Sequence, residues 1–90
     1  MKVVHRQQLQ SKDSQKITLP IDSKILTVQM LGDNICIWFI TDPKQDELEE
    51  RHIIMLGTGH TIESGHRIKY IGTVQMAGGS LIWHVFEQWV

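Results

Sequence analysis

Residues 24–40 read KILTVQMLGDNICIWFI, a pattern that indicates a β-hairpin. Residues 24–31 alternate between polar and apolar side chains, which predicts a strand with Leu26, Val28 and Met30 on one face. Gly32-Asp33-Asn34 has hairpin-turn chemistry, because glycine and asparagine tolerate positive φ. Residues 35–40 are apolar on both faces, so we expect a central strand in which Cys36 is a buried thiol.

Further short strands are predicted over residues 2–9, 15–19, 51–56, 67–76 and 81–89. The first reads as an edge strand. Alternation over residues 67–76 places Ile68, Tyr70, Val74 and Met76 on one face, and Lys69, Thr73 and Gln75 on the other. The charged residues 44–50 are predicted to form an exposed loop or a single helical turn. Since no segment keeps a helical period, we expect an all-β fold, a small antiparallel β-sandwich or barrel of about seven strands in one domain over residues 1–90.

One tetrapeptide occurs twice, as residues 27–30 and again as residues 73–76, both reading TVQM. Each copy runs into a glycine-containing turn and then an apolar strand that carries Trp38 or Trp83. The second copy reaches its tryptophan one residue sooner, which predicts that the two indoles lie on different faces unless a bulge compensates. Two similar hairpins packed as two sheets would explain the repeat, and chance similarity between hairpins is the alternative.

Charge and cysteine content exclude several classes of protein. The formal net charge is −1 with no basic stripe, so binding to a DNA or RNA polymer is not expected. Cys36 is the only cysteine, which excludes an intramolecular disulfide and fits a reducing compartment. The first residues lack an apolar signal core, and no apolar run is long enough to span a membrane. These features predict a cytoplasmic protein.

The most distinctive local string is the loop Gly57-Thr58-Gly59-His60, followed six residues later by His66. Glycines let the backbone approach a ligand closely, and successive amides can form a nest for an anion, with His60 as an added donor. The loop therefore predicts a site for a phosphate or carboxylate. The alternative is a plain connecting turn between two strands. Stacking of a base would come from Tyr70, or from Trp89 near the end of the chain, which also suggests a subunit interface.

The sequence contains no comparable pattern for catalysis or metal binding. Zinc sites need three or four protein ligands, and the histidine spacing, including His60 and His66, demands none. Ser64, Ser80 and Cys36 lack a nucleophile context, and the carboxylates of residues 46–50 lie in the predicted loop. We therefore expect no catalytic residues, no metal and no cofactor, and a protein that is not an enzyme.

Several strings together resemble a family of small, uncharacterised proteins encoded by bacteriophages and prophages. The matching segments cover nearly the whole chain: residues 19–20, 24–29, 37–38, 42–43, 57–60 with Ile62, 70–75 and 83–87. Where that family commonly has proline after the Gly-Thr-Gly-His string, this chain has Thr61. The resemblance implies a domain of unknown function, so it assigns no catalytic residue, and it implies a phage context in which small proteins often counter host defence.

Two hypotheses of different class follow. In the first, a homo-oligomeric phage anti-defence protein sequesters a small phosphorylated, nucleotide-type ligand held by Gly57, Thr58, Gly59, His60 and His66 and stacked on Tyr70 or Trp89. In the second, the protein inhibits a host defence protein by binding it through the exposed sheet face of Lys69, Thr73 and Gln75 or through the first strand as an edge. A virion or structural accessory role is a third possibility.

Overall fold

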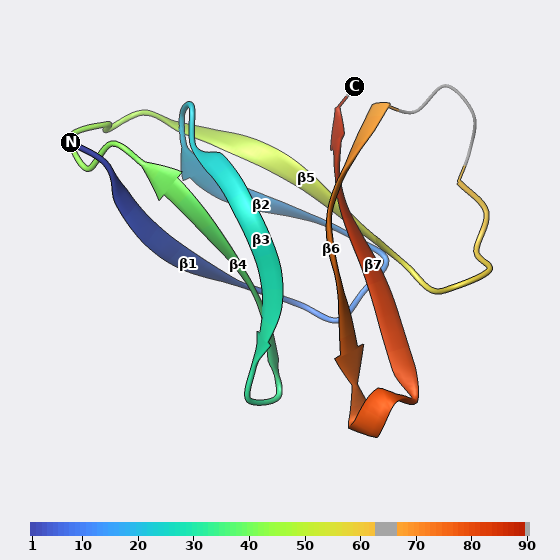
Figure 1. Ribbon diagram of the computed structural model, residues 1–90. Coiled ribbons are helices and arrows are strands. Elements are labelled where there is room, and N and C mark those ends of the chain that lie inside the picture. The colour runs from blue at the N-terminus through green and yellow to red at the C-terminus, as the bar shows by residue number, and fades with distance from the viewer. Residues whose placement is uncertain (63–66, 90) are drawn as a thin grey trace.

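Residues 24–40 form the expected hairpin in the computed structural model, which describes residues 1–62 and 67–89. Within these ranges the chain folds into seven strands: β1 (Val3–Leu9), β2 (Ser14–Pro20), β3 (Lys24–Leu31), β4 (Asn34–Thr41), β5 (Leu48–Leu56), β6 (Arg67–Met76) and β7 (Leu81–Trp89). A short 3₁₀ turn, η1 (Ala77–Gly79), joins β6 to β7. The strands make two antiparallel sheets, β1-β4-β3 and β2-β5-β7-β6, as an all-β sandwich (Figure 1).

The core lies between the sheets and follows the period-two alternation of the strands. On β4, which is central as predicted, the inward side chains are Ile35, Ile37 and Phe39, all buried. The opposite sheet contributes Ile53, Met55 and Val85, which are fully buried. Each such aliphatic side chain stabilises the fold by about 1.5–3 kcal/mol. Cys36 is a buried free thiol, which confirms the prediction.

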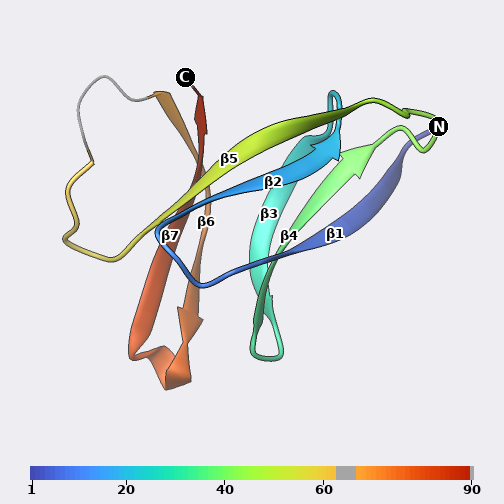
Figure 2. The ribbon, with the colours of Figure 1, turned by 180° about the vertical axis from the view of Figure 1, so that it is seen from behind.

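Both sheets contain the same three-stranded unit. In the first, β1 and β3 flank β4, and in the second, β5 and β6 flank β7, with β2 added beside β5. The two hairpins that carry the TVQM repeat are β3–β4 and β6–β7. They point the same way, and their first strands, β3 and β6, lie side by side in different sheets (Figures 1 and 2). This is the arrangement that the two-hairpin interpretation of the repeat predicts.

The edges of β3 and β6 lie close together at Gly72. A β-carbon built on Gly72 would lie 2.8 Å from Cγ1 of Val28, nearer than real side chains pack. Glycine is therefore required at this position by the close approach of the two sheets rather than by its backbone angles.

A bulge in β3 and another in β6 place two residues, Leu26 and Tyr70, on a different face from the predicted one. The pairing of β3 with β4 shifts between Ile25 and Thr27, so Leu26 is exposed and Ile25 joins Val28 on the core side. The pairing of β6 with β7 shifts between Tyr70 and Gly72, so Tyr70 shares the outer face with Thr73 instead of the inner face with Val74. An inserted residue reverses the alternation locally, and the side-chain pattern alone carries no sign of it.

The predicted loop over residues 44–50 is shorter than expected. Leu48, Glu49 and Glu50 are the first residues of β5 and pair with the end of β2. Acidic side chains are tolerated there because the strand begins at the margin of the sheet, where Glu49 reaches an arginine described below.

Candidate functional site

A groove of about 490 Å³ lies where the two bulged edges diverge, and we call it the inter-edge groove. One wall comes from β3 and the other from β6, and the ends of β5 and β7 form the floor. Its lining residues are Ser23, Lys24, Ile25, Leu26, Arg51, Lys69, Tyr70, Ile71, Glu87 and Trp89. Bulges are frequent beside functional sites because they redirect side chains, and here both bulges of the fold border one groove.

Large apolar side chains are exposed around this groove. Leu26 is 45% exposed, Tyr70 57% and Trp89 43%. The Tyr70 ring packs edge-on against Phe86, with centroids 5.5 Å apart, so the ring is supported on one side. Exposed aromatic rings held in this way are suited to stacking against a planar ligand.

Two lysines border the groove, one on each wall. Lys24 lies two residues before the bulge of β3, and Lys69 lies two residues before the bulge of β6. The ion pairs of the described residues all belong to Arg51, so neither ammonium group is neutralised within 4 Å in that part of the chain. The two walls therefore carry positive charges that no carboxylate of residues 1–62 or 67–89 pairs with.

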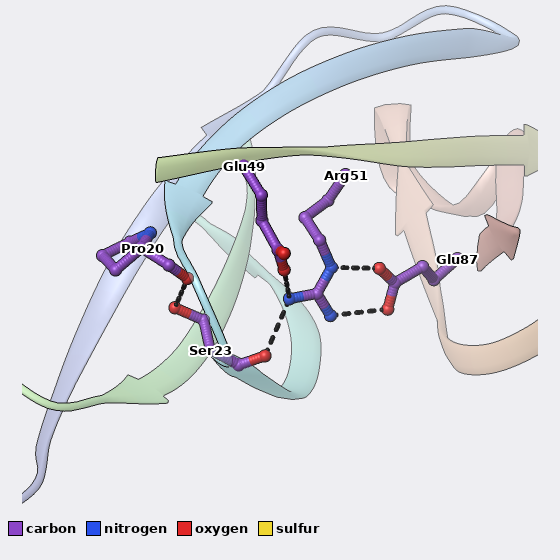
Figure 3. Close-up of polar contacts among 5 residues, drawn as sticks. All are labelled: Pro20, Ser23, Glu49, Arg51 and Glu87. Atoms are coloured by element: carbon purple, nitrogen blue, oxygen red, sulfur yellow. Dashed lines mark hydrogen bonds and ion pairs between the residues drawn. The ribbon is translucent and has the colours of Figure 1, made fainter. Parts of the chain in front are cut away.

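Arg51 and Glu87 form the floor through a two-pronged ion pair (Figure 3). The Nε of Arg51 donates to Oε2 of Glu87, and its Nη2 donates to Oε1 at 2.9 Å. The remaining Nη1 donates to the backbone oxygen of Ser23 at 2.7 Å and to Oε1 of Glu49 at 3.3 Å. Because Ser23 belongs to the β2–β3 turn, Arg51 ties β5 and β7 to the start of the other sheet.

This ion pair is largely buried. The Glu87 side chain is 6% exposed and the Arg51 side chain 15%. The hydrogen bond with Glu87 raises the pKa of Arg51 above its ordinary value, although burial acts in the opposite direction. A raised pKa means that the charged Arg51 contributes its full stability below the pKa of the unfolded side chain. That contribution is lost only as the pH rises through the folded value, far above neutrality.

A second cavity, of about 580 Å³, lies on the other side of this pair. It shares Ser23, Arg51, Glu87 and Trp89 with the inter-edge groove. Its remaining lining is mixed in charge, with Lys16 and His52 beside Asp22, Glu49 and Glu50. The two cavities thus share the Arg51–Glu87 pair and differ in the charge of their remaining lining.

The predicted loop Gly57-Thr58-Gly59-His60 begins the connection from β5 to β6 and leaves the molecule on the side away from the β1-β4-β3 sheet (Figures 1 and 2). It closes on itself: the Gly57 amide donates to Nδ1 of His60 at 3.1 Å, and the His60 amide donates to the Gly57 oxygen at 3.1 Å. Gly59 has a φ of +89°, which suits glycine. Two of the amides that a phosphate nest would use are therefore already occupied.

Thr58 is the loop residue that contacts the sheet. Its hydroxyl lies 2.7 Å from Nε2 of His84, and Nδ1 of the same ring lies 3.0 Å from the Thr73 hydroxyl. The Thr73 hydroxyl in turn lies 2.5 Å from the hydroxyl of Tyr70. A neutral imidazole donates through one nitrogen and accepts through the other, and each hydroxyl can donate or accept, so either tautomer of His84 satisfies the chain Thr58–His84–Thr73–Tyr70.

The structure brings together some of the predicted ligand residues and separates others. Tyr70 and Trp89 both line the inter-edge groove, and Thr58 reaches Tyr70 through the hydrogen-bond chain. Trp89 lies five residues beyond His84 on β7, about 17 Å along the strand. Gly57, Gly59 and His60 therefore lie away from Trp89, and His66 falls outside the described residues.

Sequence reasoning missed Lys24 and the Arg51–Glu87 pair, and it named Lys69 only as part of an exposed sheet face for protein binding. A signal for the pair was present, since Arg51 alternates in phase with buried Ile53 and Met55, and Glu87 with buried Val85. Charged side chains in phase with a core face are rarely buried unless they are paired. The two lysines gave no such signal.

The described residues contain no group of three side chains that could hold a metal ion. No helix in the described chain has the length and apolar character needed to cross a membrane.

Comparisons with known proteins identify a family without assigning an activity. No curated protein and no solved structure matches the chain. A family described as a domain of unknown function, DUF7352, matches residues 1–90. Since the match covers the whole length, the chain belongs to the DUF7352 family.

Proposed function

We propose that this protein binds and sequesters a small anionic ligand with a planar ring, of nucleotide type, in the inter-edge groove. One observation carries the proposal: the groove places two exposed aromatic side chains, Tyr70 and Trp89, beside two lysines that lack an ion pair in the described chain. Its volume of about 490 Å³ is in the usual range for small-molecule sites.

In this proposal the lysines and the aromatic residues have separate roles. Lys24 and Lys69 neutralise the phosphate, since an ammonium group is a compact donor of three hydrogen bonds. Trp89 and the supported ring of Tyr70 stack on the base. The lysines replace the Gly57–His60 loop as the phosphate contacts, because the Gly57 and His60 amides bond within the loop.

The biological part of the proposal is sequestration without turnover. A phage anti-defence protein that removes a nucleotide signal, and does so as a homo-oligomer, needs a binding groove and no catalytic group. The phage context rests on the resemblance drawn from the sequence. Native mass spectrometry of the protein with nucleotides added would report both the number of subunits and the mass of any adduct. If the protein sequesters its ligand, that mass must equal the mass of the unmodified nucleotide.

The direct test is calorimetric titration with nucleoside monophosphates, diphosphates and cyclic dinucleotides. We expect the Lys24→Glu/Lys69→Glu variant to lose at least about tenfold in affinity, because two attractive charges become repulsive. The matched control is Lys44→Glu, an exposed reversal in the β4–β5 loop, which should bind like the parent protein. Equal affinity in both variants would place the ligand elsewhere.

A second variant separates the groove from the loop. Gly59→Asp/His60→Ala alters the loop and leaves the groove lining unchanged. We expect it to bind every nucleotide as the parent protein does, whereas Trp89→Ala should weaken binding through the loss of stacking. Loss of binding in the loop variant, with Trp89→Ala unaffected, would return the site to the Gly57–His60 loop.

A further inference from the structure

The four sheet edges of the fold differ in how well they are protected from another strand. The edges of β3 and β6 carry bulges and face each other across the Val28–Gly72 contact. The edge of β2 ends in Pro20, which has no amide to donate. β1 pairs with β4 over seven residues without a register shift and contains no proline. A straight edge of this kind is a template for another strand.

The turn of the β3–β4 hairpin determines which groups of β1 face outward. Its two central residues are closed by the pair Leu31–Asn34, so the even-numbered residues of β4 bond to β3 and the odd-numbered ones bond to β1. The amides and carbonyls of Val4, Arg6 and Gln8 consequently point away from the sheet. The Gln8 carbonyl accepts a hydrogen bond from the side chain of Gln7 at 3.0 Å, as expected of an oxygen that β4 does not use.

The charge of this sheet is one-sided. β1, β3 and β4 contain no aspartate or glutamate, although the chain has ten acidic residues. Arg6 lies at the centre of β1, is exposed, and forms no ion pair within the described chain. Two copies of β1 paired antiparallel over their full length would place Arg6 opposite Arg6, and like charges in that position are destabilising.

We infer that the free edge of β1 binds an extended, acidic segment of a partner protein, which adds to the sheet as an antiparallel strand with a carboxylate opposite Arg6. Backbone hydrogen bonds to residues 4, 6 and 8 supply the attachment, and the charge of Arg6 supplies the selection. Hydrophobic contact comes from Val4, which is exposed on the same face as Arg6. This surface is separate from the inter-edge groove and does not depend on the proposed nucleotide binding.

The test uses the full chain and two synthetic heptapeptides of alternating threonine and valine, one with a central glutamate and one with a central lysine. Amide chemical shifts and hydrogen exchange are followed by NMR. The glutamate peptide should protect the amides of Val4, Arg6 and Gln8 and leave Lys16, on the edge of β2, unchanged. Its dissociation constant should be lower than that of the lysine peptide by about fivefold.

Arg6→Glu should reverse the preference between the two peptides, and Arg6→Gln should abolish it. The matched control is Lys12→Glu, a reversal in the turn after β1, which should keep the preference for the glutamate peptide. The inference is wrong if neither peptide protects these amides at millimolar concentration, or if both bind equally. Protection that rises with protein concentration in the absence of peptide would also overturn it, in favour of a second copy of the chain.

Discussion

The hairpins β3–β4 and β6–β7 carry the same tetrapeptide at an offset of 46 residues, yet they differ in the residues that face it. Thr27 pairs with Trp38, whereas Thr73 pairs with His84. Val28 pairs with Ile37, whereas Val74 pairs with Trp83, which packs against the core. The one-residue slip predicted from the sequence therefore places the two tryptophans on opposite faces, and His84 occupies the outer position that Trp38 has in the first hairpin.

At the same offset of 46 residues, Thr41 of β4 corresponds to Glu87 of β7. Both side chains are buried, but the Thr41 hydroxyl has no hydrogen-bond partner in the described chain, whereas Glu87 holds Arg51. The strands of the first hairpin contain no acidic residue, and the second contains the carboxylate of the groove floor. One backbone plan thus supports an apolar layer in one copy and a polar site in the other.

The largest expected difference in unfolding free energy between the two hairpins is at Thr41 and Glu87. Glu87→Ala should lower the free energy of unfolding by about 3 kcal/mol, because it leaves the guanidinium of Arg51 buried with only Glu49 and Ser23. Thr41→Val should be neutral or stabilising by about 1 kcal/mol, since it removes an unpaired hydroxyl. Urea unfolding followed by circular dichroism measures both.

A double variant shows whether the Glu87 effect comes from the unpaired charge. Arg51→Met/Glu87→Leu should regain most of the loss, since apolar replacement of a buried ion pair is often close to neutral. If the double variant is as unstable as Glu87→Ala, the pair acts through its geometry in linking β5, β7 and the β2–β3 turn.

The second contrast concerns the contact between the hairpins. Gly72→Ala should cost about 1–3 kcal/mol, because the added methyl group would lie 2.8 Å from Val28. Leu26 stands at the matching offset and is exposed, so Leu26→Ala should change stability by less than about 0.5 kcal/mol. Thermal unfolding of both variants tests this, and equal effects would mean that the two sheet edges can separate at little cost.

The smallest expected difference is between the two repeated threonines. Thr73→Val removes the link between His84 and Tyr70 and should cost about 0.5–1 kcal/mol. Among the described residues, the Thr27 hydroxyl bonds only to the neighbouring Val28 carbonyl, at 3.4 Å, so Thr27→Val should have an effect within about 0.5 kcal/mol. Urea unfolding of Thr73→Val and Thr27→Val measures the difference.

Strand positions and the central role of β4 could be predicted from the sequence, because alternation reports directly on burial. Bulges could not: Leu26 and Ile71 are as apolar as the core residues beside them, and only the pairing partner shows that each is an extra residue. The start of β5 was missed for a related reason. Glu49 and Glu50 read as solvated loop residues, and their place in the sheet depends on β2 and Arg51.

The candidate site was predictable only in part. Trp89 stands out in the sequence as an aromatic residue without a core position, and Tyr70 was a candidate for stacking although its alternation predicted the inner face. The structure places both at the inter-edge groove. Lys24 and Lys69 are ordinary surface lysines in the sequence, and their meeting across two sheets depends on tertiary packing. The Gly57–His60 loop was conspicuous in the sequence, but the amides of Gly57 and His60 form hydrogen bonds within the loop itself.

The route of β2 affects how the chain must fold. β2 lies between two strands of the first three-stranded unit in sequence, yet it pairs with β5 of the second. The first half of the chain therefore contributes a strand, β2, to the sheet that the second half forms. The second half cannot complete its four-stranded sheet without β2, and β2 of the first half has no pairing partner without β5, so we expect the two copies to unfold as one cooperative unit. Separate fragments cut in the β4–β5 loop should stay disordered until they are mixed.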